Sequence, residues 1–367
     1  PDWFNRPLPF LSPQEIIWLL YEARTGRIPV RGAGYTGKFG GSGWDSLWTD
    51  MSEIVRPTRD GIHGREYIST ATDIGYFPPS LKHGKGNFFT IEVPIIFDEP
   101  PPGKEQHKLA RIFLRAAKVC KTVCVIPATI LSKSKSQILP DDFTNAILLI
   151  LTPEDIERSK NYIRHSKAVF TGSPELAIKI KELFPEKLTG IKTKISNWQN
   201  ETILKNFKLF WFYCNYDGYD GEKFIKDYLI DIHKSLSKTG IRSSVTVIVS
   251  GGINTAEHLP KALLCGANAT VVNLPLWIAL NASVKLNQNF QNENGEYPME
   301  ISFPSFREEW AVQRIVNMVN AWRDQLLEVS GAMGIRDTRR MTGEHGRLIL
   351  QEIAEKEAFS GIEGFPD

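Results

Sequence analysis

The stretch VTVIVSGGINTAEHLPKALLCGANATVVN, residues 245–273, decides the fold. An apolar run ends in Gly251-Gly252, a helical segment follows, and Cys265-Gly266 leads into a second apolar run. Two apolar strands joined by a helix are the repeating unit of a parallel sheet. The glycine pair after the first strand also lets a ligand or another backbone approach closely.

Apolar runs of the same kind recur upstream of this stretch. Counted together with its two runs, they are 93–97, 122–126, 146–151, 167–170, 191–196, 208–214, 245–250 and 269–273. Near-continuous apolar runs are typical of strands that are buried on both faces. Helices are expected between them, over 104–118, 153–163, 174–184, 221–237 and 256–265. This alternation predicts an α/β fold, a (β/α)8 TIM barrel, with an open doubly wound sheet as the alternative.

The predicted barrel, residues 91–280, is flanked by two segments of different texture. Residues 1–90 are expected to be an irregular, glycine-rich N-terminal segment with a short helix. Within it, no strand precedes the glycine-rich stretch 31–43, which is therefore predicted to be an exposed turn rather than a phosphate loop. Residues 281–367 are expected to form a polar insertion and a C-terminal helical extension, whose long helix covers 308–335 and packs on the barrel.

The composition excludes several classes of protein. Of the 367 residues, 42% are hydrophobic and 23% are charged, which is typical of a globular chain. Lys and Arg number 44 against 42 Asp and Glu, so neither nucleic acid nor an anionic membrane is expected as the main partner. The longest apolar run is far shorter than the roughly 20 residues of a membrane-spanning helix. Four cysteines and no signal-peptide pattern predict a reducing, cytoplasmic location.

The loops after the seventh and eighth strands are the usual phosphate site of a barrel. Ser250, Gly251, Gly252 and Ile253 follow the predicted seventh strand. Backbone N–H groups in such a glycine turn can point toward an anion. The alternative is that the two glycines only make a tight turn from strand to helix.

The fifth apolar run places lysines inside the predicted barrel. Lys192 and Lys194 alternate with Ile191, Thr193 and Ile195. If the apolar face meets the helices, both lysines point into the barrel. Because a charge is seldom buried without a partner, Lys194, the nearer to the strand's C-terminal end, indicates an anionic ligand. An interior carboxylate that pairs with the lysine is the alternative.

Acidic residues follow the sixth run. Asp217 and Glu222 are candidates for polar contacts with a ligand, although Asp-Gly pairs also simply form turns. The spacing of the histidines fits neither a zinc site nor a Ser-His-Asp triad, so no metal site is predicted.

Four segments resemble one known family when they are taken in order. They are 51–75, 215–222, 250–272 and 326–348, and they resemble the FMN-binding domain of the glutamate synthase family, especially stand-alone glutamate-synthase-like proteins. The resemblance implies a barrel that holds FMN and passes electrons to a 2-oxoglutarate or imine-type substrate in glutamate formation. It implies an oxidoreductase subunit acting on CH-NH2 donors, with an electron donor of the FAD/NAD(P)H or ferredoxin type as partner. It leaves a homo-oligomer open.

The resemblance also implies roles for individual residues. Ser250 to Ile253 would lie at the FMN phosphate, and Lys194 would lie near the isoalloxazine or a substrate carboxylate. The residues expected to bind the cofactor are Lys194, Asp217, Ser250, Gly251, Gly252, Ile253, Asn273 and Leu274. The residues expected to act in catalysis are Lys194 and Glu222.

The sequence departs from the family at the ligand end. Asn273-Leu274-Pro275 stands where relatives have a glycine turn for the phosphate, and proline lacks an N–H donor. Asp220 and Glu222 stand in place of a glycine-rich loop and would repel an anion. No cysteine follows Cys265, so no iron–sulfur cluster is expected in this chain.

These departures support an alternative function. The chain would then be a flavin-free structural or assembly subunit of a larger redox complex. Arg339 and Arg340, in an otherwise neutral region, would contact an acidic partner subunit or the flavin phosphate, and a solvated charged surface is the alternative.

Overall fold

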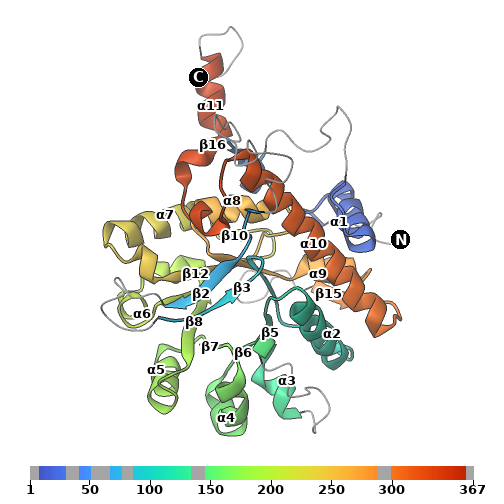
Figure 1. Cartoon of the computed structure of the whole chain (residues 1–367), viewed down its shortest axis with the longest axis vertical. Helices are drawn as coiled ribbons and strands as arrows, with labels where there is room; N and C mark the ends of the chain where they lie inside the picture. The colour runs from blue at the N-terminus through green and yellow to red at the C-terminus, as the bar shows by residue number, and fades with distance from the viewer. Residues whose placement is uncertain are drawn as a thin grey trace.

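The barrel predicted from the sequence is confirmed. The computed structural model describes residues 8–29, 41–50, 67–76, 86–133, 145–286 and 299–360, and in them eight parallel strands form a closed barrel (Figure 1). In chain order these strands are β4 (Ile95–Phe97), β5 (Cys124–Pro127), β6 (Ile147–Ile150), β7 (Ala168–Thr171), β8 (Leu188–Lys194), β9 (Leu209–Tyr213), β12 (Thr246–Ser250) and β13 (Ala269–Val272). Because β13 pairs with β4, the sheet closes, and the open-sheet alternative is wrong.

Helices surround the barrel. They are α2 (Gln106–Val119), α3 (Ala128–Lys133), α4 (Ile156–His165), α5 (Pro174–Leu183), α6 (Glu201–Asn206), α7 (Ile225–Lys238), α8 (His258–Cys265) and α9 (Leu274–Ala279). Of these, α2, α4, α5, α7 and α8 lie where helices were predicted, and α3, α6 and α9 were not predicted. The start of α5 illustrates the local chemistry, because the Ser173 hydroxyl accepts the amide hydrogen of Leu176 at 3.1 Å. None of the described helices is both long and apolar enough to cross a membrane.

Strand β8 differs from its predicted bounds of 191–196. It starts three residues earlier, at Leu188, and includes Gly190. A Cβ at Gly190 would come within 2.5 Å of the Phe170 ring, so only glycine fits there. The strand ends at Lys194, because Ile195 begins a 3-10 turn. The glycine conceals the first half of the strand from a search for apolar runs.

A β-hairpin closes the N-terminal end of the barrel. Its strands are β2 (Thr72–Tyr76) and β3 (Asn87–Ile91), so the prediction that residues 1–90 are irregular is wrong for this part. Ile74 and Phe89 belong to the same buried cluster as the barrel residue Trp211. The Thr246 hydroxyl accepts from the Gly75 N–H at 3.0 Å and donates to the Gly75 carbonyl at 2.8 Å. The hairpin is therefore part of the barrel core.

Two helices outside the barrel pack on each other. Helix α1 (Pro13–Thr25) begins with a capping box between Ser12 and Glu15. Helix α10 (Glu308–Ala332) ends three residues before the predicted 335. The buried Glu22 of α1 accepts a hydrogen bond from the Trp322 indole of α10 at 2.9 Å.

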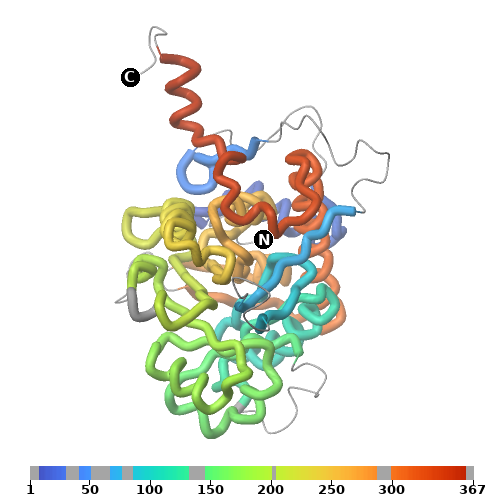
Figure 2. Tube along the Cα trace, turned by 60° about the vertical axis from the view of Figure 1, so that its left-hand side comes forward, coloured from blue at the N-terminus to red at the C-terminus, as the bar shows by residue number. Residues whose placement is uncertain are grey.

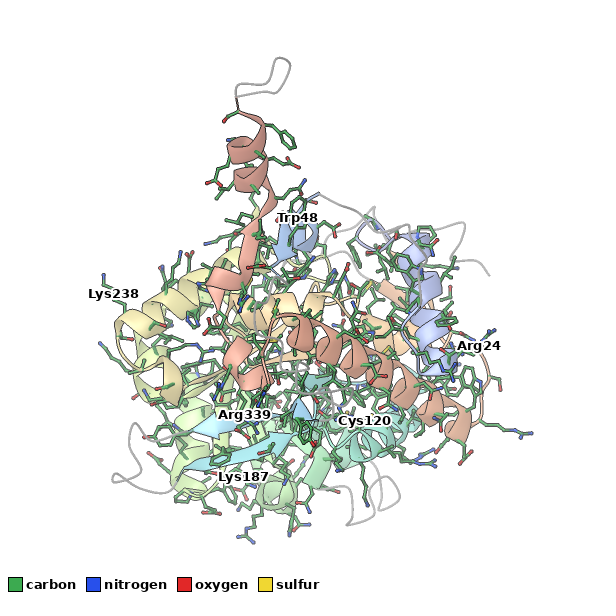
Figure 3. All side chains as sticks on the ribbon, turned by 45° about the horizontal axis from the view of Figure 1, so that its top comes forward. Arg24, Trp48, Cys120, Lys187, Lys238 and Arg339 are labelled. Carbon is green, nitrogen blue, oxygen red and sulfur yellow. The ribbon has the colours of Figure 1, made fainter. Side chains whose placement is uncertain are left out.

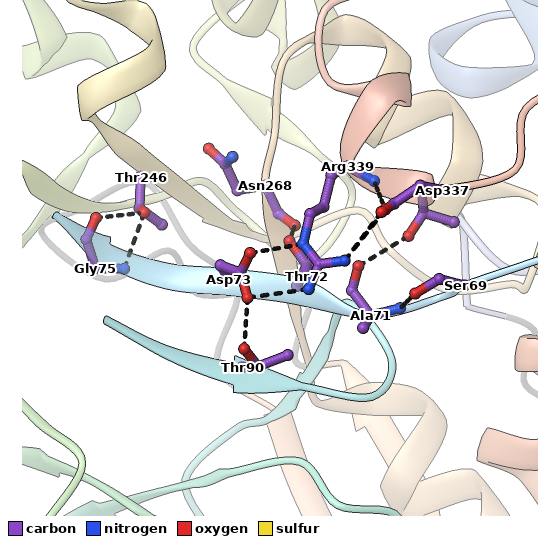
Figure 4. Close-up of polar contacts among 11 residues, drawn as sticks. Ser69, Ala71, Thr72, Asp73, Gly75, Thr90, Thr246, Asn268, Asp337 and Arg339 are labelled. Atoms are coloured by element: carbon purple, nitrogen blue, oxygen red, sulfur yellow. Dashed lines mark hydrogen bonds and ion pairs between the residues drawn. The ribbon is translucent and has the colours of Figure 1, made fainter. Parts of the chain in front are cut away.

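The C-terminal segment is tied to the hairpin by Arg339. Its guanidinium contacts Asp73 of β2 at 2.6 Å and Asp337 at 3.1 Å (Figure 4). Arg339 therefore has partners within its own chain, and its contact with a partner subunit stays a prediction. Arg340, which is exposed, keeps that prediction untested.

Beyond this segment, the chain leaves the body of the molecule. Strand β16 (Leu348–Leu350) pairs with β1 (Leu47–Thr49), and helix α11 (Gln351–Phe359) projects outward from this pair (Figure 2).

Candidate functional site

Ionisable groups gather at the C-terminal mouth of the barrel. We define the mouth cluster as Asp98, Glu99, Lys192 and Asn273. Asp98 and Glu99 directly follow β4, and Asn273 follows the adjacent strand β13. The Asp98 carboxylate accepts from the Glu99 amide at 2.8 Å and from the Asn273 side chain at 3.2 Å. Lys192 on β8 reaches Glu99, with Nζ to Oε1 at 3.4 Å. This is the end of a barrel where active sites lie.

Lys192 confirms the predicted direction of the lysines in β8. Its Nζ lies 4.2 Å from the centre of the buried Trp211 ring, inside the barrel. A cation over an indole face is electrostatically stabilised. Its partner is the carboxylate of Glu99, which corresponds to the alternative of an interior carboxylate.

Asp98 is an acid in an unusual environment. Burial raises its pKa to about 6, against the opposing effects of the Lys192 charge and the hydrogen bonds from Glu99 and Asn273. A carboxyl with a pKa near 6 can exchange a proton close to neutral pH. Sequence reasoning missed this residue. The signal that could have found it is the Asp-Glu pair directly after an apolar barrel strand.

The predicted catalytic residues are not brought together by described contacts. Lys194 lies two residues beyond Lys192 on β8, on the same face, beside Tyr213 of β9. Glu222 is exposed in the turn between β10 (Tyr219–Asp220) and β11 (Lys223–Phe224). Within the described residues no contact joins Glu222 to the mouth cluster, and its catalytic role stays a prediction.

The predicted phosphate turn has the expected glycine geometry. Gly251 and Gly252 have φ values of +98° and +69°, which disfavour other residues. A Cβ on Gly251 would come within 2.5 Å of the Asn215 carbonyl oxygen, and one on Gly252 within 2.6 Å of the Gly218 Cα. The close approach that these glycines permit is therefore to the loop after β9.

The neighbouring candidates are mostly engaged within the protein. The Ser250 hydroxyl accepts the Trp211 indole hydrogen at 2.8 Å. Ile253 is buried. Asp217 accepts the Tyr219 amide hydrogen at 2.9 Å, and burial raises its pKa.

The amides at the phosphate end test whether FMN fits this site. The Gly252 N–H donates to the Tyr216 carbonyl at 3.2 Å, and the Asn254 N–H donates to the His258 ring at 3.1 Å. After β13, the Leu274 N–H donates to the Asn273 side chain at 2.6 Å. Each of these donors already has a partner in the chain. These three backbone donors are therefore not free to bind a phosphate while their contacts within the chain are kept.

A cavity of about 650 Å³ lies beside Gly252. Its size is within the range of small-molecule sites. Among its described lining residues, Glu15, Asp45 and Asp217 carry carboxylates, and none is Lys or Arg. The ionisable side chains in this described part of the lining are therefore mainly acidic.

Comparison with known proteins gives a family likeness for one part of the chain. The conserved region in glutamate synthase matches residues 226–336. The archaeal glutamate synthase (NADPH) of Methanocaldococcus jannaschii is 25% identical over 133 residues, 34% of this chain and 25% of the relative. The matched stretch thus spans about a quarter of that relative's length.

Solved structures share the fold of the whole chain. The flavin-binding domain of baker's yeast flavocytochrome b2 has a TM-score of 0.52 at 14% identity, covering 97% of this chain and 91% of that one. A mandelate oxidase mutant with a monooxide FMN adduct has a TM-score of 0.50 at 13% identity, covering 90% of each chain. The resemblance predicted from the sequence is confirmed: residues 226–336 match the conserved region in glutamate synthase, and about a third of the chain is similar to an archaeal glutamate synthase.

Proposed function

We propose that this chain is an oxidoreductase subunit of the glutamate synthase type, whose barrel binds FMN at its C-terminal mouth. The observation that carries the proposal is where the family match falls. Residues 226–336 include β12, β13 and the loops that follow them, which is the part of a barrel that commonly binds a ligand phosphate. When bound, the flavin would supply the electron-transfer chemistry. The substrate would be a 2-oxo acid or imine, with electrons from a partner of the FAD/NAD(P)H or ferredoxin type.

The residues of this chain that support the proposal are those of the mouth cluster. Lys192 places a cation over the Trp211 ring, and Asp98 has a carboxyl whose pKa is raised to about 6. Such groups suit the ring end of a flavin and a polar substrate. Because the backbone donors of Gly252, Asn254 and Leu274 are occupied within the chain, no reaction step is assigned to the cofactor.

The test is a visible absorption spectrum of the purified protein, followed by denaturation and analysis of the released chromophore. Bound FMN gives bands at about 370 and 450 nm and a fluorescent supernatant. A colourless protein that also takes up no added FMN contradicts the proposal.

A second candidate function is a flavin-free structural subunit of a redox complex. It is favoured by the engaged amides of Gly252, Asn254 and Leu274, since those donors have partners without any ligand. The same spectrum separates the two functions, because the structural subunit would be colourless both as purified and after incubation with FMN.

A further inference from the structure

Two histidines join the C-terminal segment to helix α7. His233 lies on α7 and His345 lies on the C-terminal segment, and their ring centres are 4.9 Å apart. Figure 3 labels Lys238 on α7 and Arg339 on the C-terminal segment. We define residues 342–346 as the docked turn. Its contact with α7 is therefore made by a pair of titratable rings.

The docked turn also binds the C-terminal end of α8. The last carbonyl groups of a helix have no partner within the helix. The Gly343 N–H donates to the Leu263 carbonyl at 3.0 Å. The Nε2 atom of His345 lies 3.2 Å from the Cys265 carbonyl oxygen. Because a carbonyl oxygen only accepts, this nitrogen of His345 carries a hydrogen.

The contacts of His233 require its neutral form. The Arg242 Nε–H donates to the Nδ1 atom of His233 at 3.1 Å, so this nitrogen presents a lone pair and the ring hydrogen is on Nε2. Arg242 is held by three more acceptors, which are the carbonyls of Val245 and Gly266 and the side chain of Asn268, at 2.9, 2.8 and 3.0 Å. A proton added to Nδ1 would face the N–H of a cation that is held in place, so the ring would have to move.

The His233 ring is confined by two glycines. Gly343 of the docked turn has a φ of +77°, and a Cβ there would overlap the Nδ1 and Cε1 atoms of the ring. On another side, a Cβ at Gly266 would come within 2.8 Å of the His233 Cβ. Because the backbone of Gly343 packs directly against the ring, the ring cannot move away from Arg242 unless the docked turn moves too.

The charges around the two rings favour the neutral forms. Burial lowers the pKa of His233 to about 4, and the charges of Arg242 and His345 act in the same direction. Burial also lowers the pKa of His345, with a further contribution from Lys234, whereas its hydrogen-bonded carbonyl and Glu344 oppose the shift. Protonated His345 would keep its Nε2 hydrogen bond. Protonated His233 would lose its contact with Arg242, so His233 is the ring whose charge matters for docking.

We propose that His233 is a pH sensor, whose protonation breaks its contact with Arg242 and releases the docked turn from α8. The docked state is fully favoured above about pH 6.5, where a solvated histidine is neutral, and loses that preference as the pH falls toward 4. The ion pair of Arg339 with Asp73 and the pairing of β16 with β1 hold the chain on either side of the turn, so the opening is local. This inference does not depend on FMN binding.

The test is amide hydrogen exchange of the full chain at pH 7 and pH 5. The Gly343 amide reports the opening, because its hydrogen bond to Leu263 is lost when the turn is released. Dividing the intrinsic exchange rate by the observed rate gives a protection factor that is corrected for the pH dependence of exchange itself. We expect the protection factor of Gly343 in wild type to be about tenfold lower at pH 5 than at pH 7.

Three variants assign the response to one ring. His233→Asn keeps an acceptor near the position of Nδ1 and cannot be protonated, so its protection factor should be the same at both pH values. His345→Gln keeps an N–H donor for Cys265 and should retain most of the fall. The matched control is His165→Asn, at an exposed histidine whose Nδ1 contacts the Asn161 carbonyl of its own helix, and it should behave as wild type.

A second measurement does not require any variant to fold. An NMR titration of the His233 ring in wild type should give a midpoint near pH 4, with the ring hydrogen on Nε2 at neutral pH. A midpoint at the ordinary value of about 6.5 overturns the proposal. Wild-type protection of Gly343 that does not change between pH 7 and pH 5 also overturns it, as does a fall that persists in His233→Asn.

Discussion

The two ends of the barrel are built from different kinds of residue. At the N-terminal end, Ile74 and Phe89 of the β2–β3 hairpin fill the interior with apolar side chains. At the C-terminal end, Asp98, Glu99 and Lys192 form a charged cluster that includes a carboxyl with a raised pKa. In barrel enzymes the first end serves stability and the second serves chemistry. The difference predicts that substitutions at the two ends will change different observables.

The largest effect is expected at the apolar end. Replacing Phe89, which is 9% exposed, by Ala removes a large side chain of the β2–β3 hairpin from the core and leaves a cavity. We expect the free energy of unfolding to fall by about 3 kcal/mol, measured by urea denaturation. FMN affinity of the folded fraction should be unchanged, because the proposed site lies at the other end.

The matched control for this substitution is the preceding residue. Phe88 lies on the same strand but is 48% exposed, so Phe88→Ala should cost less than about 1 kcal/mol. Equal losses in the free energy of unfolding for the two variants would show that the hairpin does not close the end of the barrel.

The raised pKa of Asp98, at the mouth, should make the free energy of unfolding depend on pH. A carboxyl whose folded pKa is raised stabilises the protein fully below its unfolded pKa, about 3.9, and loses that contribution as the pH rises through the folded value. For Asp98, with a folded pKa of about 6, the loss falls between about pH 4 and pH 7. Asp98→Asn removes this titration. We therefore expect the free energy of unfolding of wild type to fall by about 2 kcal/mol relative to that of the variant across that window.

The measurement is urea denaturation of both proteins at several pH values. Because Asn keeps the size of the side chain, packing is little changed. The pH dependence of the difference then reports the titration itself. A difference that does not vary between about pH 4 and pH 7 would mean that Asp98 titrates normally and that the mouth lacks this acid.

Much of the fold could be predicted because burial leaves a strong pattern. Barrel strands such as β12 and β13 are covered on both faces, so they appear as continuous apolar runs. The hairpin was not predicted because β2 contains Thr72, Asp73 and Gly75, which break that pattern. Only closure of the barrel gives such a mixed strand an apolar surface to cover.

The site could be predicted only in part, because its contacts join residues distant in sequence. The alternation of residues in one strand was enough to predict that Lys192 points into the barrel. The contact between Asn273 and Asp98 spans 175 residues and depends on the pairing of β13 with β4. Trp44 stands in a segment without periodicity, and nothing local indicates that it reaches Gly252.

The smallest effect tests how the N-terminal end is held together. Burial raises the pKa of Asp73, but the hydrogen bonds from Arg339 and Thr90 and the Arg339 charge outweigh it, so the pKa lies below its usual value. The pair is partly exposed, so its coupling energy should be about 1 kcal/mol in a double-mutant cycle of Asp73→Asn and Arg339→Met.

A carboxylate with a lowered folded pKa stabilises above its unfolded pKa and loses that contribution as the pH falls through the folded value. The coupling should therefore be present at neutral pH and decline below about pH 4, whereas Arg340→Met, at the exposed neighbour, should show none. A coupling that persists in acid would mean that packing of the Arg339 side chain, rather than its charge, ties the C-terminal segment to the hairpin.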